Sequence, residues 1–257
     1  MTEPSAGRGQ ARAGAALVTG GGRRIGRAIC LELARAGFDV AIHYRNSGEE
    51  AESVAGEVRA LGRRAATVAA DLAVEAGTRR LIPDAVAAIG PLAVLVNNAS
   101  VFEDDRVGAL SRATWDAHME TNLRAPIVLA EAFAAQAPDG SAIVNLLDQR
   151  VLKPDPRFIS YALSRNGLWW ATRTLAQALA PRIRVNGVGP GPTLPSTHQS
   201  EVEFEAEARA IPLARAGSPE AVASAVRWLV DAELVTGQMI AVDGGQHLAW
   251  KTPDIVE

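Results

Sequence analysis

Residues 15–26 read Ala-Ala-Leu-Val-Thr-Gly-Gly-Gly-Arg-Arg-Ile-Gly, and this stretch decides the fold. A short apolar run ends in a glycine cluster, and an amphipathic segment begins directly after it. Glycine lets the backbone turn tightly and approach a pyrophosphate, whose charge is stabilised by the N-terminus of the next helix. In this strand–turn–helix context the glycines indicate a dinucleotide site, and a turn without a ligand is the weaker alternative.

The same rhythm continues along the chain, because brief apolar runs alternate with longer segments of helical period. Seven strands are expected at Ala15–Val18, Val40–Ile42, Ala66–Ala70, Ala93–Val96, Ala142–Leu147, Arg184–Val188 and Met239–Val242. Helices are expected at Ile25–Ala36, Glu49–Leu61, Gly77–Ile89, Thr114–Gln136, Ile159–Ala180 and Pro219–Val230. The pattern predicts an α/β protein: a single-domain, Rossmann-like, doubly wound parallel sheet of about seven strands with helices on both faces.

The domain is expected to span residues 13–250, between a disordered tail at 1–12 and a C-terminal tail at 251–257. One stretch, Gly189 to Pro212, breaks the rhythm with prolines and a polar, acidic run. A long insertion after a strand end is either a lid or a poorly ordered loop. Its place at the carboxyl edge of the sheet favours a lid at about 192–212.

Composition excludes several classes of protein. The 257 residues are 48% hydrophobic and carry a net charge of −3, which fits a globular protein and argues against a nucleic-acid surface. No apolar run approaches the roughly 18 residues of a membrane span. The single cysteine, Cys30, fits a reducing, cytoplasmic setting. The four histidines are scattered without metal-ligand spacing, so no metal site is expected.

The end of the second strand favours NADP(H) as the cofactor. It reads His43-Tyr44-Arg45-Asn46-Ser47, without the carboxylate that would bond a free ribose 2′-hydroxyl. Arg45 and Ser47 can donate to a 2′-phosphate; the alternative is that Arg45 only faces solvent. Further cofactor-binding residues are expected at the ends of the neighbouring strands: Gly20, Arg23, Arg24, Ile25, Tyr44, Asn46, Asp71, Leu72, Asn98, Ala99 and Ser100.

These motifs, in this order, resemble those of the short-chain dehydrogenases/reductases, over roughly residues 15 to 247. They are Thr19-Gly20-x-x-x-Arg24-Ile25-Gly26, Asn97-Asn98-Ala99-Ser100, Asn122, Tyr161 and Val185-Asn186-Gly187-Val188-Gly189-Pro190-Gly191. The resemblance implies a Rossmann fold, a nicotinamide cofactor and a homodimer or homotetramer. It also places Pro190 and Gly191 at the nicotinamide amide.

Three details are similar to one branch, the pteridine and dihydromonapterin reductases. Arg24 stands where most of the family has a glycine, and Ser100-Val101-Phe102 resembles the branch's Ser-x-Phe, whose phenylalanine stacks on the pterin. Asp148, 13 residues before Tyr161, stands where the family has its catalytic serine, as in the pteridine reductases.

Tyr161 is the expected proton donor, and the family places a lysine four residues later to hold the ribose and favour the phenolate. Here that residue is Arg165, which keeps the positive charge but is bulkier and cannot release its proton. Either Arg165 substitutes for the lysine, or the protein is slow or inactive; a working site is favoured.

Asp148 points to the substrate on physical grounds. A carboxylate opposes the negative charge that ketone reduction builds on oxygen, and it raises the pKa of a nearby tyrosine. Reduction of a C=N bond develops positive charge on nitrogen instead, so Asp148 becomes a partner or proton relay. The alternative is a carboxylate that faces solvent or pairs with Arg150.

Three candidates remain less specific. Asn122 resembles the family's anchor for a proton-relay water, and a buried amide that pins a helix bend is nearly as good an interpretation. Leu194 or His198 is expected to meet the substrate from the lid. Substrate contacts are therefore assigned to Arg24, Ser100, Phe102, Asp148, Tyr161 and Leu194.

The sequence thus predicts an NADPH-dependent oxidoreductase that reduces the C=N bond of a pterin-like heterocycle. Hydride comes from the nicotinamide, and Tyr161 with Asp148 supplies the proton. A short-chain carbonyl reductase for ketones or aldehydes is the second hypothesis. A non-catalytic NADP-binding protein is the third, supported only by Arg165. Neither a nucleic acid nor a membrane is expected as a partner.

Overall fold

A computed structural model describes residues 14–196 and 199–250 of the chain. Its core is a seven-stranded parallel sheet with the order β3-β2-β1-β4-β5-β6-β7. The strands are β1 Ala15–Val18, β2 Asp39–Tyr44, β3 Ala65–Ala69, β4 Leu92–Asn97, β5 Ser141–Leu146, β6 Ile183–Pro190 and β7 Met239–Val242. Each expected strand is therefore present, with ends shifted by at most two residues. The two predicted tails, 1–12 and 251–257, lie outside the described residues.

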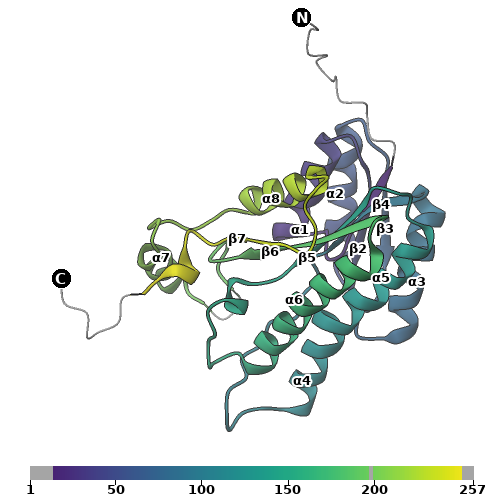
Figure 1. The fold of residues 1–257 in the computed structure, drawn as a ribbon. Helices are drawn as coiled ribbons and strands as arrows, with labels where there is room; N and C mark the ends of the chain where they lie inside the picture. The colour runs from purple at the N-terminus through teal and green to yellow at the C-terminus, as the bar shows by residue number, and fades with distance from the viewer. Residues whose placement is uncertain (1–13, 197–198, 251–257) are drawn as a thin grey trace, which may run out of the picture.

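Helices cover both faces of the sheet (Figure 1). The α-helices are α1 Arg24–Arg35, α2 Gly48–Ala60, α3 Glu75–Ile89, α4 Arg112–His118, α5 Ala125–Gln136, α6 Ile159–Leu179, α7 Glu201–Ala210 and α8 Pro219–Asp231. A π-helical turn, η1, spans Met119–Arg124, and two 3-10 turns, η2 and η3, span Gln149–Val151 and Gln246–Leu248. The predicted doubly wound α/β architecture is confirmed.

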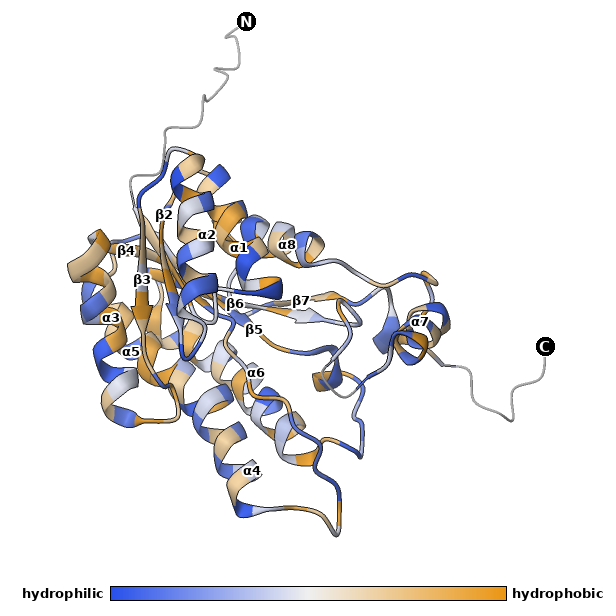
Figure 2. Cartoon of the chain, turned by 180° about the vertical axis from the view of Figure 1, so that it is seen from behind, coloured by the Kyte–Doolittle hydropathy of each residue, from blue (hydrophilic) through white to orange (hydrophobic). Residues whose placement is uncertain are grey.

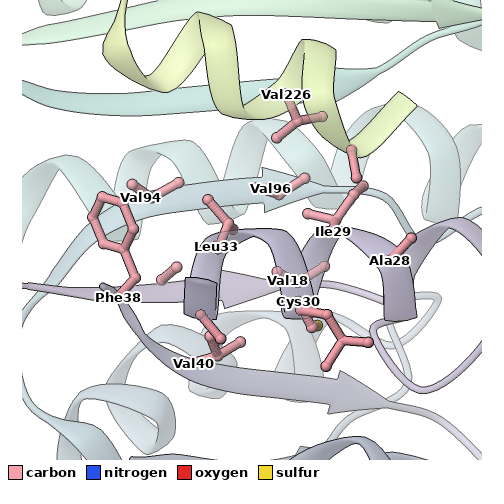
Figure 3. Close-up of a cluster of buried hydrophobic side chains, with 14 of the residues drawn as sticks. Val18, Ala28, Ile29, Cys30, Leu33, Phe38, Val40, Val94, Val96 and Val226 are labelled. Carbon is pink, nitrogen blue, oxygen red and sulfur yellow. The ribbon is translucent and has the colours of Figure 1, made fainter. Parts of the chain in front are cut away.

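Two apolar clusters, one on each face of the sheet, hold the layers together. On one face α1, α2 and α8 pack on the strands, with Ile29, Leu33, Phe38 and Val226 fully or nearly fully buried (Figure 3). On the other face α3 and α5 bury Leu81, Leu129 and Phe133 against the sheet. Hydrophobic residues therefore follow the strands, while the helices carry hydrophilic residues on their outer sides (Figure 2).

Two predicted segments differ from the structure. The expected single helix over 114–136 is three pieces, because a π turn at Met119–Arg124 inserts an extra residue between α4 and α5. The acidic part of the expected lid forms a helix, α7, in place of the poorly ordered loop of the alternative, and its action as a lid stays a prediction. Ser200 begins it with a capping box, in which Ser200 and Glu203 satisfy each other's backbone N–H groups.

The order of the strands places the binding site. The chain leaves β1 towards β2 and β3, then crosses back to β4 on the other side of β1. Ligands of open α/β sheets bind at the carboxyl ends of the strands where the order reverses. The glycine turn after β1 lies at this point, and α7 lies beyond the ends of β6 and β7 (Figure 1). Within the described residues, no helix is long and apolar enough to cross a membrane.

Candidate active site

A cavity of about 600 Å³ lies at the carboxyl ends of β1 to β4. It brings together all the predicted cofactor residues that precede and follow these strands: Gly20, Arg23, Arg24, Ile25, Tyr44, Arg45, Asn46, Ser47, Asp71, Leu72, Asn98, Ala99 and Ser100. The residues come from four separate segments of the sequence, so their convergence is a property of the fold.

The glycine turn is fixed by close backbone packing. Gly20 has a φ of +62°, a left-handed conformation that side chains disfavour. A Cβ on Gly26 would lie 2.1 Å from the carbonyl oxygen of Gly20, so only glycine fits there. The amide of Asn98 donates to the carbonyls of Thr19 and Gly20 at 2.8 and 3.1 Å. These contacts preform a cradle into which a pyrophosphate fits.

A buried histidine supports the same turn from β2. The Gly20 N–H donates to Nδ1 of His43 at 3.0 Å, and Nε2 of His43 lies 3.1 Å from the carbonyl oxygen of Ala70. Because Nδ1 accepts, the ring is neutral with its proton on Nε2. Burial lowers the pKa of His43 from 6.5 to about 4.

The start of α2 is suited to a 2′-phosphate. Ser47 is the N-cap residue of α2, yet its hydroxyl makes no capping bond, so it is available to a ligand. Arg45 beside it is exposed and lines the cavity, and the helix N-terminus favours an anion. Arg23 also lines the cavity while its guanidinium pairs with Glu50, and its predicted contact with the cofactor stays a prediction.

Arg24 links the cofactor cavity to the lid segment. Its φ is +51°, which is unusual for a residue with a side chain, and its guanidinium donates to the carbonyl of Pro195 at 2.8 Å. The side chain therefore bridges the turn after β1 and the segment after β6. Arg24 also lines the second cavity, described next.

A second cavity of about 730 Å³ adjoins the first at the ends of β4, β5 and β6. It is lined by the predicted substrate residues and by the predicted nicotinamide residues: Arg24, Ser100, Phe102, Asp148, Tyr161, Arg165, Pro190, Gly191 and Leu194. Arg24, Ile25, Asn98 and Ser100 line both cavities, so a ligand in one can touch a ligand in the other. His198 lies outside the described residues.

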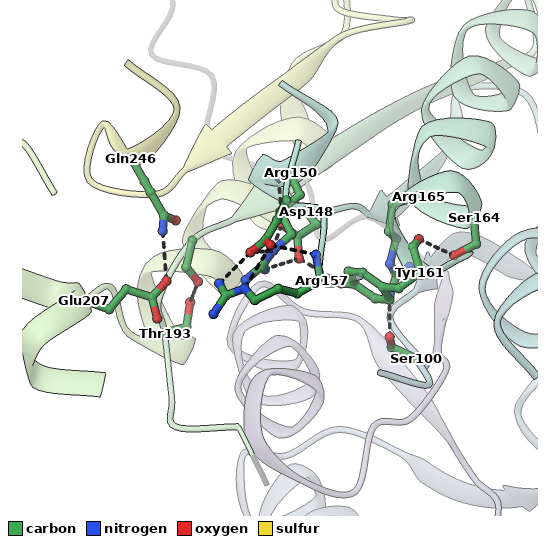
Figure 4. A network of polar contacts seen from close by, with 12 residues as sticks. Ser100, Asp148, Arg150, Arg157, Tyr161, Ser164, Arg165, Thr193, Glu207 and Gln246 are labelled. Carbon is green, nitrogen blue, oxygen red and sulfur yellow. Dashed lines mark hydrogen bonds and ion pairs between the residues drawn. The ribbon is translucent and has the colours of Figure 1, made fainter. Parts of the chain in front are cut away.

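Tyr161 and Asp148 form a direct pair (Figure 4). The hydroxyl of Tyr161 donates to Oδ2 of Asp148 at 2.8 Å, and both side chains are buried. Arg150 also binds Asp148, through its backbone N–H at 2.8 Å and its guanidinium at 3.2 Å from Oδ2. Asp148 thus contacts Tyr161 and pairs with Arg150 at once, and its role as a partner or proton relay in C=N reduction stays a prediction.

The surroundings of Tyr161 keep its proton in place. Burial and the negative charge of Asp148 raise the pKa of Tyr161, and the nearby Arg165 opposes this without reversing it. Arg165 favours the phenolate, as expected from the lysine of the family, but burial and Asp148 outweigh its effect on the pKa of Tyr161. The phenol is a neutral hydrogen-bond donor at ordinary pH.

Arg165 lies under the site as a buried cation, 3% exposed. It donates to the carbonyl of Leu146 at 2.9 Å and to the hydroxyl of Ser100, and its guanidinium carbon lies 5.3 Å from the centre of the Tyr161 ring. Its Nε is buried without a partner among the described residues. The side chain lines the substrate cavity, and its predicted contact with the ribose stays a prediction.

Asn122 lies in the π turn and is fully buried. Its amide forms two bonds with the backbone of Val101: Nδ2 donates to the carbonyl at 2.9 Å, and Oδ1 accepts from the N–H at 2.8 Å. This arrangement pins the loop after β4, as expected for an amide at a helix bend. Its role in a proton relay stays a prediction.

The structure adds Phe158, a residue that the sequence patterns did not single out. Phe158 packs on Phe102 with ring centres 4.6 Å apart, and Phe102 meets the edge of Tyr161 at 4.7 Å. The guanidinium of Arg150 lies 5.0 Å from the centre of the Phe158 ring. Phe158 lies three residues before Tyr161, a helical spacing that could have indicated it.

With this geometry established, comparisons with known proteins show the family. The family model described as enoyl-(acyl carrier protein) reductase matches residues 20–247. The chain belongs to the short-chain dehydrogenase/reductase family. The predicted family and the predicted enzyme class, an oxidoreductase, are both confirmed. Within the described residues, no cluster of acidic, histidine or cysteine side chains could hold a metal ion.

Solved structures of this family include close relatives with NADP. The chain is 50% identical to FolM alternative dihydrofolate reductase 1 from Brucella canis, complexed with NADP, with a TM-score of 0.92; the match covers 96% of this chain and 98% of that one. A short-chain dehydrogenase from Burkholderia cenocepacia with NADP is 34% identical, with a TM-score of 0.88 over 93% and 99% of the two chains. NADP is thus the nucleotide named for both structures, in agreement with the predicted cofactor.

A curated relative points to a different substrate. The 3-oxoacyl-[acyl-carrier-protein] reductase FabG of Staphylococcus aureus is 34% identical over 240 residues, which are 91% of this chain and 98% of that protein. Its name describes a carbonyl substrate, whereas the name of the Brucella protein describes a dihydrofolate. The family is therefore established, and the choice between C=N and C=O reduction depends on the site.

Proposed function

We propose that the protein is an NADPH-dependent reductase that converts a dihydropterin or dihydrofolate to its tetrahydro form. The observation that carries this proposal is the bond of 2.8 Å from the Tyr161 hydroxyl to Oδ2 of Asp148. A proton donor is here paired with a carboxylate inside a cavity with aromatic walls, and a flat heterocycle with a basic nitrogen suits these groups. The 50% identity to the Brucella dihydrofolate reductase also supports it.

The cofactor residues fit NADPH. The glycine turn and the N-terminus of α1 would hold the pyrophosphate, and Arg45 with Ser47 would hold the 2′-phosphate. When bound, the reduced nicotinamide supplies the hydride. Pro190, Gly191 and Arg165 would line its ring and ribose, at the junction where the two cavities share Arg24, Asn98 and Ser100.

The residues of the substrate cavity would each have a separate role: ring stacking, proton donation or charge stabilisation. Phe102 would lie against the pterin ring, with Phe158 packed behind it. The raised pKa of Tyr161 keeps its hydroxyl protonated at ordinary pH, so Tyr161 would enter the reaction with a proton that it can donate to the substrate nitrogen. Asp148 would stabilise the positive charge that develops on a protonated C=N nitrogen, and Arg150 holds the carboxylate in place by pairing with it.

Reduction of a ketone is the second candidate, and the 34% identity to FabG favours it. In that reaction an oxyanion forms next to the proton donor. The carboxylate of Asp148, which accepts from Tyr161, would repel this charge. The electrostatics of the pair therefore favour the pterin.

Replacement of Asp148 by serine tests the proposal. The Asp148→Ser variant restores a neutral hydroxyl, so we expect dihydropterin turnover to fall by about 10²-fold or more and ketone turnover to rise. NADPH oxidation is followed with each substrate, and NADH serves as the cofactor control. Asp139→Ser is a matched variant, since Asp139 is 81% exposed and pairs with Arg182. Unchanged dihydropterin turnover in Asp148→Ser would contradict the proposed role.

A non-catalytic NADP-binding protein predicts a different result. Such a protein would bind NADPH tightly, reduce neither substrate, and gain nothing from Arg165→Lys. We expect turnover in the wild-type protein, because Arg165 already places a positive charge 5.3 Å from the Tyr161 ring. The homodimer or homotetramer and the cytoplasmic location stay predictions.

A further inference from the structure

A second polar cluster lies directly behind the active site. Its members are His118 at the end of α4, Ser160 at the start of α6 and Asp105 in the loop after β4. All three are buried, with exposed fractions of 0, 0 and 1%. None of them lines either cavity. Burial of three polar side chains costs free energy unless they form hydrogen bonds, so the hydrogen-bond partners of the three residues indicate what the cluster holds together.

The hydrogen bonds of the cluster form a chain in which each group donates to the next. The N–H of Glu103 donates to Nε2 of His118 at 3.1 Å, so Nε2 accepts and the ring proton is on Nδ1. Nδ1 lies 2.7 Å from the hydroxyl of Ser160, which in turn donates to Oδ2 of Asp105. The same carboxylate oxygen accepts the backbone N–H of Ser160 at 2.9 Å.

The cluster connects the two segments that carry the proposed substrate contacts. Glu103 and Asp105 follow Phe102 in the loop, and Ser160 directly precedes Tyr161 in α6. Phe158, the N-cap residue of α6, supplies no side-chain bond, and Asp105 provides this bond from across the site. The His118 ring also meets the Tyr161 ring edge-on, with centres 5.8 Å apart.

We propose that His118, Ser160 and Asp105 are positioning residues that set the distance between Phe102 and Tyr161. The two rings stand 4.7 Å apart, edge to face, and the substrate would have to meet both. A shift of about 1 Å in such a geometry can cost about 10²-fold in rate. The inference rests on Tyr161 as proton donor, and it applies to a pterin or a ketone alike.

Two variants of His118 separate its bond to the Glu103 N–H from its bond to Ser160. Asparagine can reproduce the Nδ1 donor, so His118→Asn keeps the bond to Ser160 and releases the Glu103 N–H. Glutamine can reproduce the Nε2 acceptor, so His118→Gln keeps the Glu103 bond and releases Ser160. We expect His118→Asn to raise the substrate KM about 10-fold, because the Phe102 loop is freed. We expect His118→Gln to lower kcat about 10-fold, because the Tyr161 helix is freed.

The measurements are kcat and KM per folded active site, the Kd for NADPH and the midpoint of thermal unfolding. Divergent effects on KM and kcat, with an unchanged NADPH Kd, support the positioning role. A lower melting point with unchanged kcat and KM in both variants would overturn it, because the cluster would then serve stability alone.

A structural measurement separates this inference from the proposed function. If the wild-type protein reduces neither a dihydropterin nor a ketone, the proposed function fails. Crystal structures of the two variants then decide the inference: displacement of Phe102 relative to Tyr161 supports it, and an unchanged ring pair contradicts it.

Discussion

The nucleotide cavity and the substrate cavity are built in different ways. The first depends on backbone: the glycine turn after β1, the N-terminus of α1 and the start of α2 give it its shape. The second depends on side chains, since Tyr161, Asp148, Arg150 and Phe102 are held by bonds and ring contacts among themselves. Among the described residues they share only Arg24, Ile25, Asn98 and Ser100.

This difference predicts how each cavity responds to mutation. A backbone cradle fails when an added atom displaces it, and it tolerates changes of charge elsewhere. A network of side chains fails when one polar atom is removed, because a buried partner is left unsatisfied. Changes in the nucleotide cavity should therefore appear in binding and stability, and changes in the substrate cavity in turnover.

The largest effect is expected from Tyr161→Phe. Loss of the hydroxyl removes the proton donor and leaves Asp148 with Arg150 alone, so turnover should fall by about 10³-fold. NADPH binding should remain within about twofold, because the pyrophosphate and 2′-phosphate contacts lie in the other cavity. Steady-state kinetics and a fluorescence titration with NADPH measure the two quantities. Equal losses in both would mean that the cavities are not separate.

The next effect is expected from Gly26→Ala. The added Cβ would lie 2.1 Å from the carbonyl oxygen of Gly20, so the turn must move. We expect a loss of about 3 kcal/mol in the free energy of unfolding and weaker NADPH binding. In the control, Gly56→Ala, no atom lies within 4 Å of the new Cβ in α2. That change should gain about 0.5–1 kcal/mol. Similar results for both variants would contradict the cradle.

His43 predicts a pH dependence of stability. Its pKa falls from 6.5 to about 4 in the folded protein because the ring is buried. The unfolded chain therefore binds the proton first as the pH drops. The contribution of His43, about 3 kcal/mol, is complete above pH 6.5 and is lost between pH 6.5 and 4. The free energy of unfolding, measured with denaturant at several pH values in this range, should depend less steeply on pH in His43→Asn than in the wild-type protein. An identical pH dependence in both proteins would exclude this role of His43.

The smallest effect is expected at the 2′-phosphate. Arg45→Glu replaces a donor by a repelling charge, so the preference for NADPH over NADH should fall by about 30-fold, or about 2 kcal/mol. Turnover with NADH should stay near its wild-type value. Arg80→Glu, at an exposed position on α3, is the matched control for a change of net charge. A preserved preference in Arg45→Glu would assign the 2′-phosphate to other residues.

The two cavities also differ in how far the sequence predicts them. The nucleotide cavity follows from local motifs: Gly20, Arg45 and Asn98 each stand at the end of a strand, and parallel strands bring these ends together. The substrate residues Tyr161, Asp148 and Phe102 were predicted from the family resemblance. The contacts of the substrate cavity that depend on long-range packing were not predicted.

Three features illustrate that limit. Phe158 supports Phe102, and His118 joins α4 to α6; both contacts join side chains far apart in the sequence, so their spacing carries no signal. A lid was expected here from its place at the carboxyl edge of the sheet, but the helix α7 within it was not, because its acidic run has only a weak amphipathic period. The π turn at Asn122 has no sequence pattern of its own, and its bond pair with Val101 joins residues 21 apart in the chain.

The most direct test of the central claim is the oxidation of NADPH by the purified protein with a dihydropterin and with a 3-oxoacyl thioester, side by side. The Tyr161–Asp148 pair predicts turnover of the dihydropterin, a preference for NADPH over NADH, and a kcat/KM for the thioester at least about 10²-fold lower. Faster reduction of the thioester would contradict the account and assign the protein to carbonyl reduction.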